Sequence, residues 1–338
     1  MVGQPTPRTR TIVAIVIGLA AAIMAYVHLR YFEDALGFDF TWPWRAARIL
    51  IAGGNPYQEI RPDGPFPFDA YFKYPLPAAL IAVPLAWLTA PAAAAVFGGI
   101  STGLLAFGLT ERNWGRLYIL LSPPFVVTVG SGQWSTILMA GALLPALSWI
   151  AICKPTVALA VFAYRPNWWT VMGGAFLLLV SFAVLPSWLN DWIGVLRVDN
   201  LAHWYMAPIA LTGGPLILLA LLRWRRPEAR YLVGISIVPH ILGFYAGFFP
   251  MLVAETRREA QMLSLGSAVA WFATGWAMGS GSFISKAPVL AGYPLLVFIF
   301  LPALIVVLRR PNEGALGPRL ERMAARLPSW LRGEIVGA

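Results

Sequence analysis

The segment Thr11–His28 reads TIVAIVIGLAAAIMAYVH and contains no Asp, Glu, Lys or Arg. A helix of about 20 mostly apolar residues crosses the hydrocarbon core of a bilayer, and this segment is close to that length. It lacks a small-residue cleavage site and continues into an aromatic, charged stretch, so we expect a retained first span rather than a signal peptide. Similar apolar runs recur at Pro75–Leu88 and Pro288–Leu308.

The composition extends this interpretation to the whole chain. Of 338 residues, 59% are hydrophobic and 12% are charged, whereas soluble domains carry about 25% charged residues. Because lipid satisfies no backbone hydrogen bonds, helices are the expected spanning elements. The sequence therefore predicts an all-α polytopic helical bundle of roughly twelve spans in the plasma (inner) membrane. Further spans are expected at Ala92–Leu109, Leu117–Val129, Trp134–Ile150, Pro155–Tyr164, Trp168–Leu185, Ile209–Leu222 and Gln261–Met278.

The formal charge of +10 would suggest a nucleic-acid partner in a soluble protein. Here the basic residues gather in short loops, where they set the orientation of membrane helices, so no nucleic-acid partner is expected. The single cysteine, Cys153, excludes an intrachain disulfide. The three histidines, His28, His203 and His240, are too scattered for a zinc site, and we expect no cofactor.

Charge also predicts the topology. Arg8 and Arg10 precede the first span, so the N-terminus should be cytoplasmic and Leu29–Tyr74 should form a first external loop. Within that loop, Phe40–Ala52 has apolar residues near helical spacing with arginines between them, which is typical of a helix lying in the interface. The turn residues Gly53–Tyr57 then end it.

The second half of the chain offers a second external loop, Pro186–Pro208, which is rich in Trp and suited to the interface. The basic loop Arg223–Arg226 should be cytoplasmic. Tyr231–Ala254 is either one span or, as we favour, two short Pro-broken helices that meet at His240. Residues 1–308 would thus form the membrane domain, and 309–338 a cytoplasmic tail whose amphipathic part lies on the membrane surface.

Three polar residues are predicted at membrane depth, where insertion costs roughly 2.5–3.5 kcal/mol. Lys154 lies at a Pro break between two apolar helices and is either a phosphate-binding ammonium or a snorkelling lysine. His240 is either a functional histidine or one that packs helices together. Gln133 is either a ligand-binding amide or an interhelical hydrogen-bonding residue.

Asp39 immediately precedes the predicted interfacial helix and has two interpretations. Its carboxylate could cap that helix by accepting backbone N–H bonds. Alternatively it is a general base at the membrane surface that deprotonates an acceptor hydroxyl. Asp34, five residues earlier, is the competing carboxylate.

The order of these elements resembles glycosyltransferase family 87, the family of the mycobacterial polyprenyl-phosphate-mannose-dependent mannosyltransferases. The resemblance covers roughly Ile12 to Leu308 and depends on short motifs. The region between Gln133 and Lys154 departs from the family by being shorter. The motifs are Asp39-Phe40, Gly54-Asn55-Pro56-Tyr57, Tyr74-Pro75-Leu76-Pro77, Val83-Pro84-Leu85, Gly132-Gln133 and Lys154-Pro155.

The resemblance implies a C-type membrane glycosyltransferase fold. Such an enzyme takes a hexose, such as mannose, from a polyprenyl-phosphate donor and passes it to a lipid or glycan acceptor on the non-cytoplasmic face. Asp39 matches the position of the catalytic base. Lys154 and His240 would lie near the donor phosphate or the acceptor. Further candidates for substrate binding are Gln133, Tyr57 and Tyr74, which belong to the matched motifs.

Two alternatives remain open at this point. A polymerase or ligase of lipid-linked oligosaccharides also uses polyprenyl carriers, but it is expected to carry a larger external loop with paired arginines. A transporter or flippase would carry an internal repeat with matching broken helices. Breaks occur near Pro155 and Pro239, but the sequence around them does not repeat.

Overall fold

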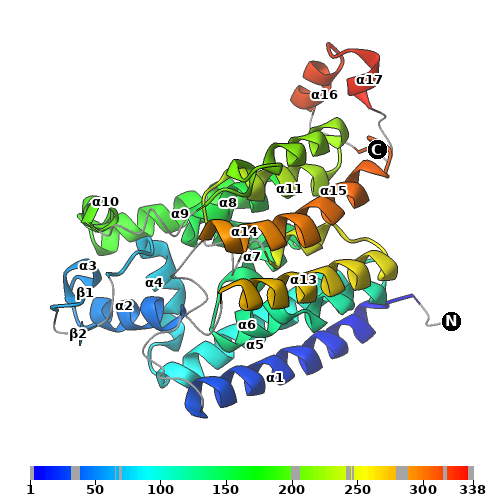
Figure 1. The fold of residues 1–338 in the computed structure, drawn as a ribbon. Helices are drawn as coiled ribbons and strands as arrows, with labels where there is room; N and C mark the ends of the chain where they lie inside the picture. Colours follow the sequence, from blue (N-terminus) through cyan, green and yellow to red (C-terminus); the bar gives the residue numbers. More distant parts are fainter. Residues whose placement is uncertain are drawn as a thin grey trace. The chain divides into compact units, whose positions relative to one another are not determined.

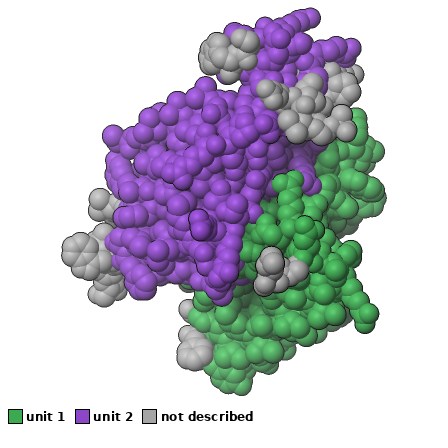
Figure 2. Space-filling view, turned by 90° about the vertical axis from the view of Figure 1, so that its right-hand side faces the viewer, with its two compact units in different colours: residues 1–117, 125–158, 167–203 green, residues 118–124, 159–166, 204–338 purple. Residues whose placement is uncertain are grey.

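The protein is predominantly helical and forms two compact units. The structure, a computed structural model, describes residues 4–31, 39–64, 66–67, 71–198, 206–240, 245, 247–278, 288–314 and 318–333. It is all-α and 76% helical. Unit 1 comprises residues 1–117, 125–158 and 167–203, and unit 2 comprises residues 118–124, 159–166 and 204–338 (Figure 2).

Unit 1 is built on two long helices, α1 (Pro7–Tyr31) and α5 (Ala90–Leu109), which lie side by side along their length (Figure 1). Small residues allow the close approach. A Cβ built on Gly99 would lie 2.8 Å from the Ala22 Cβ, and one on Gly18 would lie 2.8 Å from the Gly99 carbonyl oxygen. Stripes of small residues are the usual way in which membrane helices pack.

The other apolar segments between residues 75 and 198 are shorter or bent, and parts of them, residues 118–124 and 159–166, belong to unit 2. Pro75–Leu88, expected as a span, forms α4 (Leu76–Ala82) and the 3₁₀ helix η2 (Val83–Leu85). The expected spans Leu117–Val129 and Trp134–Ile150 were wrong as continuous helices, because prolines and glycines interrupt them. They form η3 (Trp114–Leu121), α6 (Pro123–Gly130), α7 (Ser135–Leu143) and η4 (Pro145–Cys153).

The bend between α6 and α7 measures 113°. It follows from Gly132, whose φ of +60° is a left-handed conformation that glycine adopts without steric cost. After η4, α8 (Pro155–Tyr164) begins directly behind Lys154, as expected. Next, α9 (Trp168–Val184) bends by 94° into α10 (Trp188–Val198), which starts the predicted second external loop.

The predicted first external loop contains ordered elements that belong to unit 1. The helix expected over Phe40–Ala52 is present as α2 (Thr41–Ile51), and its place in the interface stays a prediction. A turn at Gly53, with φ +81°, ends it as expected. It is followed by the single turn α3 (Pro56–Glu59) and by a parallel pair of two-residue strands, β1 (Ile60–Arg61) and β2 (Phe66–Pro67).

Unit 2 contains the second set of helices. The segment Tyr231–Ala254 is broken, as expected: α11 (Pro227–Ile237) ends before Val238-Pro239, and η8 (Phe249–Val253) follows. A helical stretch runs from Pro288 to Leu308 and contains α14 (Pro288–Leu295), the π-helical turn η9 (Leu296–Phe300) and α15 (Leu301–Leu308). The other elements of this unit are η6 (Pro208–Ala210), η7 (Gly214–Arg223), α13 (Arg257–Met278), α16 (Pro318–Ala324) and α17 (Ser329–Arg332).

The C-terminal tail is tied to the loop Arg223–Arg226 of the same unit. Arg225 is 2% exposed and donates to both carboxylate oxygens of Glu321, at 2.8 and 3.0 Å. The Trp224 indole donates to the Leu331 carbonyl at 2.8 Å. A bidentate Arg–carboxylate pair is geometrically specific, so the tail holds a defined position against this loop.

Two of the described helices, α1 and α5, are long and apolar enough to cross a membrane. Counting each bent pair, α6–α7 and α9–α10, as one span raises that number to four. Shorter apolar helices occur at residues 76–85, 155–164, 214–223 and 292–308. Several apolar helices able to enter a membrane are thus present, as the composition predicts.

Gly98 and Gly99 provide a matched test of the packing between α1 and α5. A Cβ on Gly98 meets only the Ala25 Cβ, at an ordinary 3.9 Å, whereas one on Gly99 meets Ala22 at 2.8 Å. Gly99→Ala should destabilise the protein by about 1–3 kcal/mol through overpacking. Gly98→Ala should be neutral or stabilising by up to about 1 kcal/mol. Thermal unfolding of the purified variants in detergent checks this, and equal midpoints would contradict the helix packing.

Candidate functional site

Three polar side chains from distant parts of unit 1 meet in one cluster, here called the Asp39 cluster: Asp39, Tyr74 and Lys154. The Tyr74 hydroxyl donates to Asp39 Oδ1. The Lys154 ammonium donates to the Tyr74 hydroxyl oxygen at 2.6 Å and to Asp39 Oδ2 at 3.3 Å. The Lys154 Nζ also lies 4.0 Å from the centre of the Tyr74 ring. One carboxylate, one ammonium and one bridging hydroxyl are therefore in contact.

The bend between α6 and α7 positions Asp39. The Asp39 amide donates to the Ser131 carbonyl at 3.2 Å. Next to it, the Phe40 ring is fully buried and stacks on Phe97 with ring centres 4.1 Å apart. A Cβ on Gly132 would come within 3.3 Å of the Phe40 Cβ, so this position suits glycine for space as well as for φ.

The helix-capping interpretation of Asp39 was wrong. The N-cap residue of α2 is Phe40, which makes no side-chain capping hydrogen bond. The Asp39 carboxylate instead binds Tyr74 and Lys154. The competing carboxylate, Asp34, lies outside the described residues.

Lys154 sits at the break that the sequence predicts. It ends η4 in an extended conformation (φ −141°, ψ 76°), and Pro155 starts α8 immediately afterwards. A residue before proline is disfavoured from the helical region, so Pro155 keeps this break open. Its side chain is 19% exposed and that of Asp39 is 17% exposed. Both side chains are therefore mostly buried, and the Lys154 ammonium contacts Asp39 and Tyr74 instead of simply extending into solvent.

Tyr74 is held through its backbone from two directions. The Tyr57 hydroxyl donates to the Tyr74 carbonyl at 3.0 Å. The Trp192 indole of α10 donates to the carbonyl of the preceding residue, Lys73, at 2.8 Å. The Tyr74 ring also lies against the Phe72 and Trp134 rings, with centres 6.1 and 6.0 Å away. Few orientations of Tyr74 remain compatible with these contacts.

Asn55 organises the surroundings of Tyr57. Its side-chain oxygen accepts from the Tyr57 amide at 3.0 Å and so caps α3. Its amide donates to Asp191 of α10 at 2.8 Å, and Ser187 donates to the same carboxylate at 2.7 Å. Burial, and secondarily the Asp191 charge, raises the pKa of Tyr57 well above its usual value. Tyr57 is therefore a neutral hydrogen-bond donor at all physiological pH values.

Gln133 and Trp134 lie in the bend between α6 and α7. Gln133 is buried, and its backbone N–H donates to the Thr128 carbonyl at 2.9 Å. Trp134 is fully buried with its ring 5.0 Å from Phe97, and its indole N–H has no hydrogen-bond partner among the described atoms. The structure thus brings Gln133 to the bend that carries Asp39, without assigning a partner to its side-chain amide.

His240 belongs to unit 2, whereas the Asp39 cluster belongs to unit 1. It is fully buried and pairs with Met206 through two backbone hydrogen bonds of 3.1 and 3.2 Å. Its Nδ1 lies 2.7 Å from the Val238 carbonyl oxygen, and its Nε2 has no partner among the described residues. The ring contacts Tyr245 edge-on at 6.0 Å. Both interpretations of His240 therefore remain predictions.

Sequence reasoning missed several residues of this site. Lys73 interacts electrostatically with Lys154, so the cluster has two cations nearby. The positions of Trp192, Asn55 and Asp191 depend on contacts across more than a hundred residues of sequence. The only sequence signals were that Lys73 adjoins the Tyr74 motif and that Asn55 belongs to Gly-Asn-Pro-Tyr. Among the described residues, no group of three His, Cys, Asp or Glu side chains is arranged to hold a metal ion.

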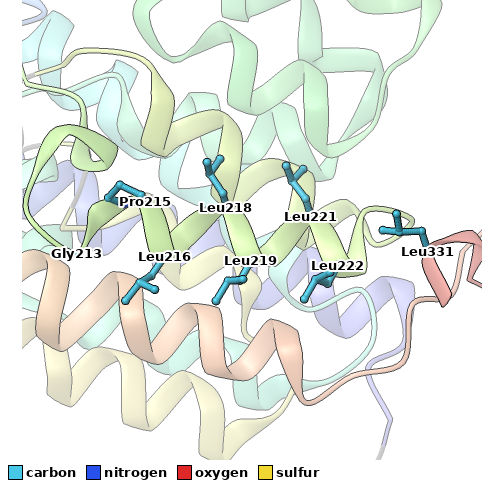
Figure 3. Close-up of a pocket in the computed structure, with 8 residues that line it drawn as sticks. All are labelled: Gly213, Pro215, Leu216, Leu218, Leu219, Leu221, Leu222 and Leu331. Carbon is cyan, nitrogen blue, oxygen red and sulfur yellow. The ribbon is translucent and has the colours of Figure 1, made fainter. Parts of the chain in front are cut away.

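A separate surface groove lies along η7 in unit 2 and has a volume of about 660 Å³. In Figure 3, Leu216, Leu219 and Leu222 form one row along η7. Pro215, Leu218 and Leu221 form the other row. Rows three residues apart are expected of a 3₁₀ helix. The groove is lined by apolar residues and offers no group for acid–base chemistry, so it is a poor candidate for a catalytic site.

Comparisons of this chain with protein-family models, with curated proteins and with solved structures found no match.

Tyr57→Phe tests the support of Tyr74. The substitution removes the 3.0 Å hydrogen bond to the Tyr74 carbonyl, which should cost about 1–3 kcal/mol because a buried acceptor loses its donor. Tyr71 lies in the same segment and is partly exposed, so Tyr71→Phe is the matched control and should be neutral. Chemical or thermal unfolding in detergent measures both. A neutral Tyr57→Phe would show that this bond does not stabilise the site.

Proposed function

We propose that the protein transfers a hexose, such as mannose, from a polyprenyl-phosphate donor to a lipid or glycan acceptor on the non-cytoplasmic face of the plasma membrane. The observation that carries this proposal is the Asp39 cluster, in which a carboxylate and an ammonium lie 3.3 Å apart around one tyrosine hydroxyl. Both side chains are mostly buried.

Inverting sugar transfer needs a base and a positive charge, and the Asp39 cluster contains a carboxylate and an ammonium. An acceptor hydroxyl attacks the anomeric carbon, and its proton must go to a base. Asp39 is that base in the proposal. The bond from the anomeric carbon to the phosphate oxygen breaks, and negative charge accumulates on the phosphate. Lys154, with Lys73 nearby, supplies the positive charge that stabilises it.

The membrane setting is consistent with such a donor. A polyprenyl chain partitions into the bilayer, so the protein needs no separate domain for a nucleotide sugar. In the proposed enzyme about twelve helices cross the membrane in a C-type arrangement. The loops Leu29–Tyr74 and Pro186–Pro208 lie outside the cell, by the positive-inside rule. The contacts of α10 with Asn55 and with the Lys73 carbonyl support a common side for these two loops.

A transporter or flippase of lipid-linked glycans is the second candidate. It is favoured by the two bent helix pairs, α6–α7 at 113° and α9–α10 at 94°. Broken helices commonly form the binding sites of transporters. This candidate predicts movement of an intact lipid-linked sugar across a vesicle membrane, with no change in its chemical structure.

Asp39→Asn tests the proposed enzyme. The amide cannot accept the acceptor proton, so the rate of sugar transfer should fall by roughly 10²–10⁴-fold. The assay uses purified protein, radiolabelled polyprenyl-phosphate mannose and membrane-lipid acceptors, with glucose and arabinose donors as alternatives.

Asp63→Asn is the matched control, because it removes an exposed carboxylate from the same loop and should keep full activity. A fully active Asp39→Asn protein would overturn the assignment of the base. A wild-type protein that transfers none of these sugars, but moves the labelled lipid between leaflets of reconstituted vesicles, would establish the second candidate instead.

A further inference from the structure

In the Asp39 cluster the two charged groups, which have separate tasks in the proposed reaction, bind each other. The proposed base accepts a hydrogen bond from the proposed phosphate-binding cation, at 3.3 Å. While this contact is made, Asp39 Oδ2 is occupied by the ammonium and is not open to the proton of an acceptor hydroxyl. Likewise, an ammonium paired with a carboxylate has less attraction left for a phosphate. The cluster as observed is therefore suited to neither task until the pair is broken.

The distances indicate which contact breaks. Charge-assisted N–H···O bonds are usually about 2.7–2.9 Å long. The bond from Lys154 to the Tyr74 hydroxyl is shorter, at 2.6 Å, while its contact with Asp39 Oδ2 is longer, at 3.3 Å. The Asp39 contact is therefore the longer of the two. Lys154 can lose it and keep its hydrogen bond to the Tyr74 hydroxyl.

Tyr74 keeps Asp39 in place during such an exchange. Its hydroxyl donates to Asp39 Oδ1, the oxygen that does not contact Lys154. The Tyr74 backbone is held independently by the Tyr57 hydroxyl at 3.0 Å. Loss of the Lys154 contact would thus free Oδ2 while Oδ1 stays anchored.

We propose that the anionic phosphate of a prenyl-phosphate ligand binds Lys154 by displacing the Asp39 carboxylate, and that this exchange activates Asp39 as the base. The inference rests on the proposed function and adds an order of events to it. Donor binding comes first and leaves Asp39 Oδ2 open to accept a proton. An acceptor that arrives without the donor meets an Asp39 carboxylate whose Oδ2 is bound to Lys154.

The resulting step is balanced. The acceptor hydroxyl oxygen forms a bond to the anomeric carbon while the bond from that carbon to the phosphate oxygen breaks. The electron pair of the broken bond leaves with the prenyl phosphate, next to Lys154. The acceptor proton passes to Asp39 Oδ2. Charge on the phosphate grows during the step, so its attraction for Lys154 increases as the carboxylate is neutralised.

A binding experiment without turnover tests the exchange. Farnesyl monophosphate is titrated into the full-length protein in detergent, with farnesol as the uncharged control. Asp39→Asn removes the competing carboxylate but keeps an acceptor for Tyr74, so binding should tighten roughly threefold to tenfold. Lys154→Gln should weaken binding by more than about tenfold. Asp63→Asn, which removes a carboxylate elsewhere in the loop, should leave binding unchanged.

The double variant Asp39→Asn/Lys154→Gln separates competition from a structural effect. If Asp39 acts only through Lys154, its substitution tightens binding in the presence of Lys154 and has no effect in its absence. Tightening that persists without Lys154, or an Asp39→Asn protein that binds no more tightly than wild type, would overturn the exchange while leaving the transferase proposal intact. A wild-type protein that neither binds farnesyl monophosphate nor transfers sugar would overturn both.

Discussion

The backbone of an apolar chain must satisfy its own hydrogen bonds, and this constraint organises the molecule. In a nonpolar environment helices meet it, whereas each interruption leaves polar groups that need other partners. The three members of the Asp39 cluster all lie at such interruptions. Asp39 precedes α2, Tyr74 directly precedes Pro75 and α4, and Lys154 separates η4 from α8. Helix breaks thus supply the polar groups of the candidate site.

The bend between α6 and α7 links these breaks. Its carbonyl at Ser131 holds the Asp39 amide, and its glycine at 132 leaves room for the buried Phe40 ring. Trp134 packs against Phe97 and Tyr74. This short glycine-containing turn therefore holds the backbone of Asp39, the proposed base, and packs against one side of the Tyr74 ring.

A second group of contacts connects the cluster with α10. Asn55 joins the turn before α3 to Asp191, and Trp192 holds the backbone of the residue before Tyr74. These residues touch neither charge of the cluster directly. They act through the position of Tyr74, so a change in α10 would be transmitted to the hydroxyl that bridges Asp39 and Lys154.

Local sequence determined the helical class, the long helices α1 and α5, the turn after α2 and the break at Lys154-Pro155. Each depends on the hydropathy or backbone preference of adjacent residues. Sequence motifs also selected Asp39, Tyr57, Tyr74 and Lys154 as separate candidates. Only the tertiary structure decided that the Lys154 ammonium contacts Asp39, that Asp39 is not a helix cap, and that Lys73, Asn55 and Trp192 belong to the same site. The reason is physical: a hydrogen bond depends on where two side chains lie after the chain folds, and for Asp39 and Lys154 these positions are 115 residues apart in sequence.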